Sequence, residues 1–269
     1  MSIIQAIAWG ILQGLTEFIP VSSSGHLVLV PWLLGCQSPN LTFDLVVHLG
    51  TLVAVALYFR RDILGLLGGA WEIVRSRKID TPEARLAVCI LVSMIPAAIL
   101  GYLFEDAIGR ILGTPGIVSL LLLVTGGILM ASEYVRHQES ALAKMRYGDA
   151  LIIGLAQSLA LMPGISRSGA TISAGLLRGL SREEAARFSF LMVLPVILGA
   201  TAYELLGAAS AGFEGAQALY LLAGFLAAFL SGYAALRFLL KYLQNHGLQP
   251  FAYYCWAFGL ASLIIGLVR

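Results

Sequence analysis

Charged residues are scarce in this chain. Asp, Glu, Lys and Arg make up 12% of its 269 residues, where a soluble globular domain carries about 25%. Hydrophobic residues make up 59%, and the mean hydropathy is +0.87. A soluble fold of this length could not bury so many apolar side chains behind so few charges. The composition excludes a soluble enzyme, a disordered chain and a nucleic-acid binder, and it favours a polytopic helical membrane protein.

Cysteine is also scarce, and short alternating strands are missing. The three cysteines stand alone in apolar surroundings, without a CxxC pair or the spacing of a metal site, so we expect them to be inert. The apolar runs are far longer than the roughly 10-residue strands of an outer-membrane barrel. The first apolar stretch contains Gln13 and Glu17 and has no basic residue before it, so we expect no cleavable signal peptide.

Six stretches are long and apolar enough to cross a bilayer, which takes about 20 residues. These predicted spans are 43–59, 86–104, 116–135, 188–206, 217–236 and 250–268. Two further apolar stretches, 3–34 and 150–180, are interrupted by Pro, Gly, Ser and ionisable residues. Each pattern is typical of a re-entrant pair, in which two short helices flank a break. Broken backbone is tolerated at membrane depth only inside protein or beside a wet cavity.

Lys and Arg gather in alternate connections, which predicts the orientation. The connections 60–85, 136–149 and 237–249 are basic and should face the cytoplasm, whereas 105–115 holds one Arg and 207–216 holds none. For all six spans to alternate, each broken stretch must return to the side from which it enters. The first should then enter from outside and the second from the cytoplasm, and both chain termini should lie outside.

The two broken stretches resemble each other. The matching parts are Gly14–Glu17 with Gly154–Gln157, Pro20 with Pro163, and Ser22–Gly25 with Ser166–Gly169. Because these segments should enter from opposite sides, they indicate an inverted-topology repeat, whose site is expected where the halves meet near the midplane. We therefore expect one integral-membrane domain over 1–269, with repeat 1 at about 1–135 and repeat 2 at about 150–269.

The first broken stretch carries a carboxylate, three serines and an imidazole. Gln13 and Glu17 are four residues apart and share one helix face. Glu17 can serve as a base or a metal ligand, whereas Gln13 can only hydrogen-bond or coordinate through its carbonyl. His26 lies three residues after Ser23, within reach of a base-activated nucleophile. Ionisable groups at membrane depth are costly, so they are functional candidates by default.

The second broken stretch carries an arginine among hydroxyls. Gly164 opens a turn, and Ser166, Arg167, Ser168 and Thr171 follow at the start of the next helix. Backbone N–H groups at a helix start favour an anion, and a guanidinium is a forked, permanently charged phosphate ligand. An arginine at this depth needs an anionic partner, which a bound phosphate or the carboxylate of the first stretch could supply.

Together these groups suit phosphoryl transfer, in which catalysis is mostly positioning and charge neutralisation. A phosphate carried on a lipid would explain a site within the membrane. The alternative is close helix packing by small polar residues, but packing alone would not need Glu17 and Arg167. Asp44 and His48 lie near the outer end of a predicted span. We interpret them as helix-end polar groups, with Asp44 at the border of the site.

Two long motifs carry a resemblance to a known family. They are Gln13-Gly-Leu-Thr-Glu17 with Pro20-Val-Ser-Ser-Ser-Gly-His26, and Pro163-Gly-Ile-Ser-Arg-Ser-Gly-Ala-Thr171. In these motifs, in length and in number of spans, the chain resembles the undecaprenyl-diphosphate phosphatases, also called bacitracin-resistance proteins. The resemblance implies an all-α polytopic fold of six transmembrane helices and two re-entrant helix pairs, arranged as interdigitated inverted-topology repeats.

The resemblance also implies an activity and a location. The family hydrolyses undecaprenyl diphosphate to undecaprenyl phosphate and inorganic phosphate, which recycles the lipid carrier of bacterial cell-wall synthesis and gives resistance to bacitracin. Its members depend on a divalent cation, for which we expect Mg²⁺ or Ca²⁺. They act in the inner membrane, with a site open toward the periplasm. We thus expect a polyprenyl diphosphate substrate, membrane lipid contacts and periplasmic termini, with a homodimer as a candidate assembly.

The resemblance assigns roles residue by residue. Glu17 matches the essential acidic residue, tied to the metal or to the nucleophile. Ser23 matches a serine often proposed as the nucleophile, and His26 matches a histidine proposed as the base or as the nucleophile itself; the sequence does not decide between them. Arg167 matches the phosphate-binding arginine. Substrate-binding roles fall to neighbouring positions, which are Gly164, Ser166, Ser168, Thr171, Ser22 and Ser24.

The chain departs from many family members at one position, where it has Gln13 instead of Glu. Gln supplies no charge, so metal binding should depend chiefly on Glu17 and the substrate diphosphate, with Gln13 as a secondary ligand. In the expected reaction Ser23 attacks with help from His26. Arg167 and nearby N–H groups hold the phosphate and stabilise the transition state.

Two other functions compete with this prediction. Inverted repeats with broken helices are also a transporter architecture, so a lipid-phosphate flippase is the main alternative, alone or in addition to the phosphatase. A flippase would need no nucleophile. The type-2 phosphatidic acid phosphatases share the Ser-Gly-His element found at 24–26, but their further His and Asp would fall at Ser173 and Leu177. We therefore reject that class.

Overall fold

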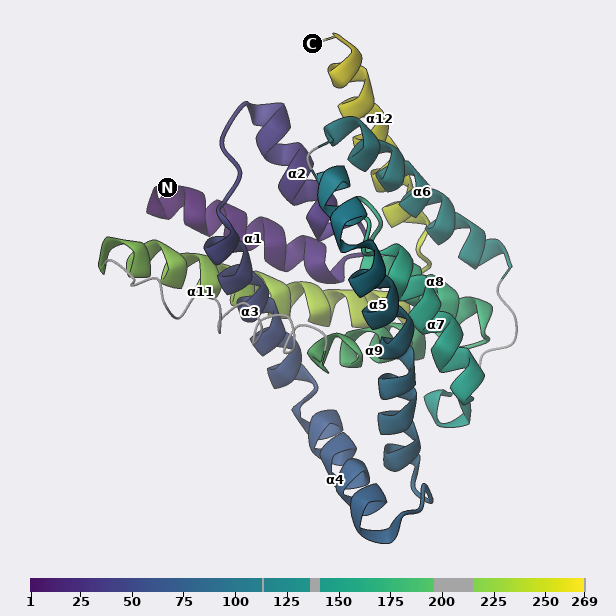
Figure 1. Ribbon diagram of the computed structural model, residues 1–269. Coiled ribbons are helices and arrows are strands. Elements are labelled where there is room, and N and C mark those ends of the chain that lie inside the picture. Colours follow the sequence, from purple (N-terminus) through teal and green to yellow (C-terminus); the bar gives the residue numbers. More distant parts are fainter. Residues whose placement is uncertain (113, 136–140, 196–214, 269) are drawn as a thin grey trace.

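The chain folds into a bundle of helices (Figure 1). The computed structural model describes residues 1–112, 114–135, 141–195 and 215–268, without the side chains of 105–112 and 215–217. Its elements are α1 (Ile3–Phe18), α2 (Ser23–Leu34), α3 (Leu41–Tyr58), α4 (Arg60–Ser76), α5 (Pro82–Leu112), α6 (Pro115–Tyr134), the 3₁₀ turn η1 (Leu142–Lys144), α7 (Tyr147–Leu159), α8 (Arg167–Leu177), α9 (Arg182–Leu191), α11 (Gly215–Leu243) and α12 (Gln249–Val268). Among the described residues, five segments are long and apolar enough to cross a membrane: α3, Pro82–Phe104 of α5, α6, Ala218–Leu243 of α11, and α12.

These five segments coincide with five of the six predicted spans. The sixth prediction, 188–206, begins inside α9 and continues into residues 196–214, which lie outside the described residues. Two of the predicted connections contain helix. The 60–85 connection includes α4, whose charged residues lie near its two ends, and the 105–115 connection is helical as far as Leu112, beyond a kink at Phe104 (φ −116°).

Both broken stretches form two helices around a break, as predicted. α1 ends at Phe18 and Ile19 is extended (φ −61°, ψ 129°), because the residue before a proline disfavours the helical region. The second break follows α7 and contains Gly164 at φ +103°, a conformation that favours glycine. A methyl group at position 164 would lie 2.5 Å from the carbonyl oxygen of Val118. The second break is therefore pressed against α6.

Small residues allow each broken stretch to approach a long helix closely. α1 lies along α11 (Figure 1), and a methyl group at Gly14 would lie 2.6 Å from the carbonyl oxygen of Ala228. In the other half, α7 lies against α5, and a methyl group at Gly154 would lie 2.8 Å from the Cα atom of Ser93. Backbones approach in this way where lipid removes the hydrophobic drive for helix association. Gly14 and Gly154 are matching positions of the two stretches.

The helix contacts follow the same order in both halves of the chain. α1 packs on α11 as α7 packs on α5, α2 touches α12 as α8 touches α6, and α6 packs on α12. In each matched pair, a helix of one half lies on a helix of the other half. Interdigitated repeats would produce this exchange, and the repeat boundaries stay a prediction.

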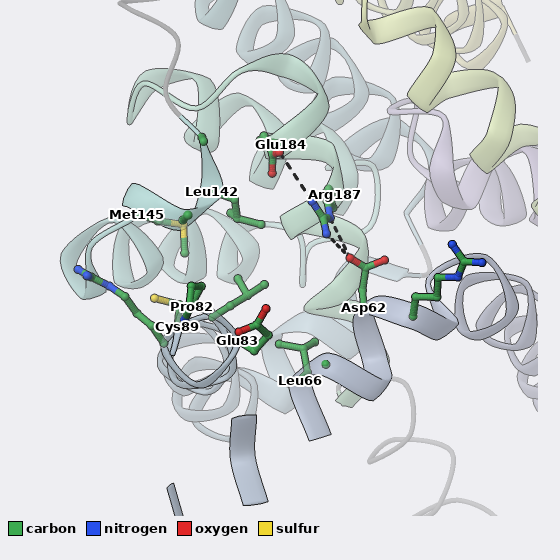
Figure 2. A pocket seen from close by; sticks show the side chains of 15 residues that line it. Asp62, Leu66, Pro82, Glu83, Cys89, Leu142, Met145, Glu184 and Arg187 are labelled. Carbon is green, nitrogen blue, oxygen red and sulfur yellow. Dashed lines mark hydrogen bonds and ion pairs between the residues drawn. The ribbon is translucent and has the colours of Figure 1, made fainter. Parts of the chain in front are cut away.

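Several helix ends from the predicted cytoplasmic side lie close together. Arg182 at the start of α9 donates from Nε to Glu133 near the end of α6 at 2.9 Å, and Gln244 after α11 donates to Glu183 at 3.2 Å. The same region holds a cavity of about 350 Å³ between α4, α5 and α9 (Figure 2). Figure 2 shows Arg187 of α9 paired with Asp62 of α4 and with Glu184 of its own helix. No residue of the two sequence motifs lines this cavity, so it is separate from the candidate site.

Candidate active site

The two helix breaks meet in the fold. A methyl group at Gly25, in the first turn of α2, would lie 3.3 Å from the Cα atom of Gly164 in the second break. The residue before Gly164 in the chain is Pro163 and α8 begins at Arg167. The polar residues of the two motifs are thus brought together, although they come from opposite halves of the sequence.

The helices that follow the two breaks begin with the same local structure. Ser22 caps α2 and Ser166 caps α8, and each hydroxyl accepts the N–H of the glycine three residues on, at 3.1 Å in both cases. Such caps satisfy N–H groups that a helix start leaves open. Each capping hydroxyl also contacts a second serine, Ser24 at 3.3 Å and Ser168 at 3.2 Å. The first helical residues after these caps are Ser23 and Arg167.

Glu17 joins these two helix starts. One carboxylate oxygen, Oε1, pairs with the guanidinium of Arg167. The other, Oε2, accepts the hydroxyl of Ser23 at 2.7 Å and the amide Nε2 of Gln13 at 2.9 Å. The Glu17 side chain is 5% exposed and that of Arg167 is 20% exposed. A buried carboxylate is stable only when it is paired and hydrogen-bonded. Glu17 therefore holds Arg167, Ser23 and Gln13 around it.

His48 lies closer to this carboxylate than the sequence interpretation suggested. Its Nε2 is 3.9 Å from Oε2 of Glu17, and its Nδ1 is 3.6 Å from a carboxylate oxygen of Asp44. We interpreted both residues as helix-end polar groups, with Asp44 at the border of the site, and the structure places His48 at that border too. The available signal was their spacing, since two ionisable residues four apart share one face of an apolar helix.

The structure gives Ser23 and His26 separate partners. The Ser23 hydroxyl donates to Glu17, whereas Nδ1 of His26 lies 2.7 Å from the carbonyl oxygen of Ser22 and Nε2 lies 2.8 Å from the hydroxyl of Tyr254. The imidazole also stacks on Tyr254 and Phe258. We expected His26 to help Ser23, but its hydrogen bonds lead to the backbone and to α12. Nothing in the sequence pattern singled out Tyr254.

The hydroxyls of the second break support its backbone. Thr125 of α6 accepts the N–H of Ser166 at 3.0 Å and donates to the carbonyl of Gly164 at 2.9 Å. Thr171 donates to the Arg167 carbonyl at 2.7 Å and lies 2.6 Å from a second hydroxyl, that of Ser189. Thr125 and Ser189 lie outside the motifs, and no sequence pattern pointed to them. Their contacts hold the turn that places Arg167 beside Glu17.

The metal ligands expected from the sequence are Glu17 and Gln13, and both offer oxygen atoms that a divalent cation can bind. Among the described residues, no group of three or more His, Cys, Asp and Glu side chains could hold a metal ion. Glu17 offers a carboxylate, and Oε1 of Gln13 is buried and accepts no hydrogen bond from the residues that the structure describes. Mg²⁺ is commonly held by one or two carboxylates together with substrate phosphates. The donor set fits a divalent cation shared with a diphosphate, and it does not fit a cage made by the protein alone.

The fold and site together define a multi-pass helical membrane protein with a buried, ion-paired polar centre. Its sequence matches the family described as Bacitracin resistance protein BacA over residues 6–261. The chain therefore belongs to the BacA family.

Curated relatives match along the whole chain. Undecaprenyl-diphosphatase of Rubrobacter xylanophilus is 44% identical, with 100% of this chain and 99% of the relative covered. The protein of the same name from Halothermothrix orenii is 44% identical with 98% of both chains covered, and that from Pelobacter propionicus is 42% identical with 94% and 93% covered.

Proposed function

We propose that this protein hydrolyses undecaprenyl diphosphate to undecaprenyl phosphate and inorganic phosphate. The observation that carries the proposal is the position of Glu17, which accepts the Ser23 hydroxyl on one oxygen and pairs with Arg167 on the other. A base, a hydroxyl nucleophile and a phosphate ligand thus meet at one point. The names of the curated relatives support the same substrate. A flippase would not need a serine hydroxyl that is hydrogen-bonded to a buried carboxylate, as Ser23 is to Glu17.

Substrate binding would begin with an exchange of partners at Arg167. Its guanidinium is more exposed than the carboxylate that it pairs with, so an incoming diphosphate reaches the arginine first. Arginine binds phosphate through two parallel N–H bonds. Transfer of Arg167 to the substrate would free Oε1 of Glu17, while Oε2 keeps the Ser23 hydroxyl. The base is therefore released in the same event that positions the phosphate.

The first chemical step would be attack by Ser23 on the terminal phosphorus. Its proton passes to Oε2 of Glu17, a Ser23 Oγ–P bond forms, and the bond between the phosphorus and the bridging oxygen breaks. Undecaprenyl phosphate leaves with the electrons of that bond. Water then attacks the phosphoserine: its oxygen bonds to the phosphorus and the Ser23 Oγ–P bond breaks. Glu17 returns its proton to the Ser23 oxygen, and the water's protons leave with inorganic phosphate. Arg167 stabilises the charge on the transferred phosphoryl group.

We propose that a divalent cation, Mg²⁺ or Ca²⁺, assists this reaction. Glu17 and the buried carbonyl of Gln13 would hold it. When bound, the cation neutralises charge on the diphosphate oxygens. Gln13 also donates its amide to Glu17, which orients the carboxylate toward Ser23.

The decisive experiment is phosphate release from undecaprenyl diphosphate by the purified protein in detergent. We expect release with Mg²⁺ or Ca²⁺ and loss of release with EDTA, restored when the cation is added back. A matched lipid that carries a single phosphate serves as the control for non-specific hydrolysis. If folded protein releases no phosphate with either cation, the proposed function is wrong, and transport of the lipid becomes the better explanation.

Replacing Arg167 with lysine should lower the turnover number about 100-fold, because lysine keeps the charge but loses the forked geometry that binds phosphate. The matched control is Arg178→Lys at the end of the same helix, where the guanidinium pairs with Asp149 at 2.8 Å. Both variants are assayed for phosphate release at saturating cation. Equal activity of the two variants would mean that Arg167 does not hold the phosphate.

We further propose the arrangement in the membrane that the sequence predicts. The two broken stretches would be re-entrant, the cavity of Figure 2 and the basic connections would face the cytoplasm, and the active site would open toward the periplasm. Gathering of the basic helix ends on one side of the bundle supports this orientation. The inner membrane of a bacterium is the proposed location, and a homodimer is the candidate assembly.

A further inference from the structure

The two ring nitrogens of His26 are both occupied in the site. Nδ1 faces the carbonyl oxygen of Ser22 at 2.7 Å, and a carbonyl can only accept, so Nδ1 carries the proton. In the neutral ring, Nε2 then has the lone pair, and it accepts from the hydroxyl of Tyr254 at 2.8 Å. The imidazole is 2% exposed. Neither nitrogen is free to take the proton of Ser23.

The backbone that His26 holds has an unusual conformation. Ser22 has φ +70° and ψ 94°, in a region that residues other than glycine rarely adopt. Such a conformation persists only where the surroundings hold it. Three bonds do so: the Ser22 hydroxyl accepts the N–H of Gly25, and the Ser22 carbonyl accepts both the backbone N–H of His26 at 3.1 Å and its imidazole. The next residue is Ser23, so this turn determines where the proposed nucleophile lies.

We propose that Tyr254 is a positioning residue for the reaction. Its hydroxyl holds His26 in the Nδ1–H tautomer, the imidazole in turn holds the Ser22 carbonyl, and the fixed turn presents Ser23 to Glu17. In this assignment His26 supports the nucleophile and is neither base nor nucleophile. The inference deepens the proposed phosphatase function and rests on it.

The position of Tyr254 on α12 matches this role. α12 packs on α6 and touches α2, so a hydrogen bond from α12 connects the first break to the helix that also supports the second. Stacking of His26 on Tyr254 and on Phe258 keeps the ring plane fixed. The hydroxyl donates to Nε2 and so stabilises the tautomer that the Ser22 carbonyl selects.

Tyr254→Phe tests the hydroxyl while it preserves the stacked ring. We expect the turnover number for undecaprenyl diphosphate to fall about tenfold, the size of one lost hydrogen bond, with KM changed less than twofold. The control is Tyr253→Phe, since the neighbouring ring is exposed and packs edge-on against Trp256. Unchanged turnover in Tyr254→Phe, or an equal loss in Tyr253→Phe, would overturn the proposal.

Nitrogen NMR of protein labelled at its four histidines supplies a readout that does not depend on activity. The His26 signals, assigned by their absence in His26→Asn, should show one tautomer with a protonated Nδ1 in the wild type. Tyr254→Phe should keep a protonated Nδ1, which the Ser22 carbonyl selects, but should shift the Nε2 signal because this nitrogen loses its hydrogen-bond donor. A single Nε2–H tautomer in the wild type would overturn the proposal. If wild-type protein releases no phosphate, the proposed function fails, and this measurement still decides whether the hydrogen-bond chain exists.

Comparison of His26→Asn with His26→Ala distinguishes a positioning role of His26 from a direct role in the reaction. An asparagine amide can still donate to the Ser22 carbonyl, whereas it cannot take up a proton or attack phosphorus. We expect His26→Asn to be at least about tenfold more active than His26→Ala, as expected when one hydrogen bond is restored. If both variants are equally inactive, His26 acts through Nε2 and the positioning role is wrong.

Discussion

Replacing Glu17 with glutamine is expected to lower phosphate release about 10⁴-fold, the upper end of the range for loss of a general base. The amide keeps the volume of the side chain but cannot take the proton of Ser23. It also places a donor where Ser23, Gln13 and Arg167 now direct theirs, so one carboxylate oxygen that the site needs as an acceptor is lost. The measurement is the initial rate of phosphate release from undecaprenyl diphosphate at saturating Mg²⁺.

The matched control for this prediction is Glu83→Gln. Glu83 is an exposed carboxylate at the start of α5, and Figure 2 shows it at the cavity, which no residue of the two motifs lines. We expect its rate to stay within about twofold of wild type, as for most surface substitutions. Thermal unfolding in detergent should confirm that both variants are folded. Retention of more than a tenth of wild-type activity by folded Glu17→Gln would exclude Glu17 as the base.

Replacing Ser23 with alanine is expected to lower the rate about 10³-fold. The variant loses the attacking oxygen, and the residual rate would come from water that Glu17 and Arg167 still position, as in other enzymes that lose their nucleophile. Acid quench during turnover supplies a direct readout. Wild-type protein should carry phosphate on Ser23 after quench, and Ser23→Ala should carry none.

Ser132→Ala is the control for the serine substitution. Ser132 is buried, and among the described residues its hydroxyl donates to the carbonyl of Leu129 within α6, so we expect nearly wild-type activity. Near-normal turnover in Ser23→Ala, with phosphate found on His26 after an alkaline quench, which preserves phosphohistidine, would assign the nucleophile to the histidine. That result would also contradict the positioning role proposed for Tyr254.

The sequence predicted the parts of the fold that strong local signals determine. Pro20 and the Pro163–Gly164 pair located both breaks, because their backbone restrictions act wherever the chain lies. Uninterrupted apolar runs located the long helices. α4 escaped prediction because its charges suggested a connection, whereas an amphipathic helix at a membrane surface carries such charges on one face.

The part of the site that could be predicted consists of charged residues within apolar stretches. Glu17 and Arg167 were identified because an ionisable residue in an apolar stretch needs a partner, and the structure pairs them. Tyr254 and Thr125 were missed because a tyrosine or threonine is ordinary in a membrane helix. Their roles depend on contacts with distant segments, and a local sequence pattern does not indicate such contacts.

The paired helix starts have a consequence for how the protein is made. Ser23 and Arg167 follow equivalent caps in the two halves, and both bind the same carboxylate. During synthesis, the first half enters the membrane carrying Glu17 before the ribosome has produced its counter-charge. The carboxylate remains unpaired by Arg167 until the second break has been inserted. No incomplete chain can therefore assemble the catalytic centre, and biogenesis and activation of this protein coincide.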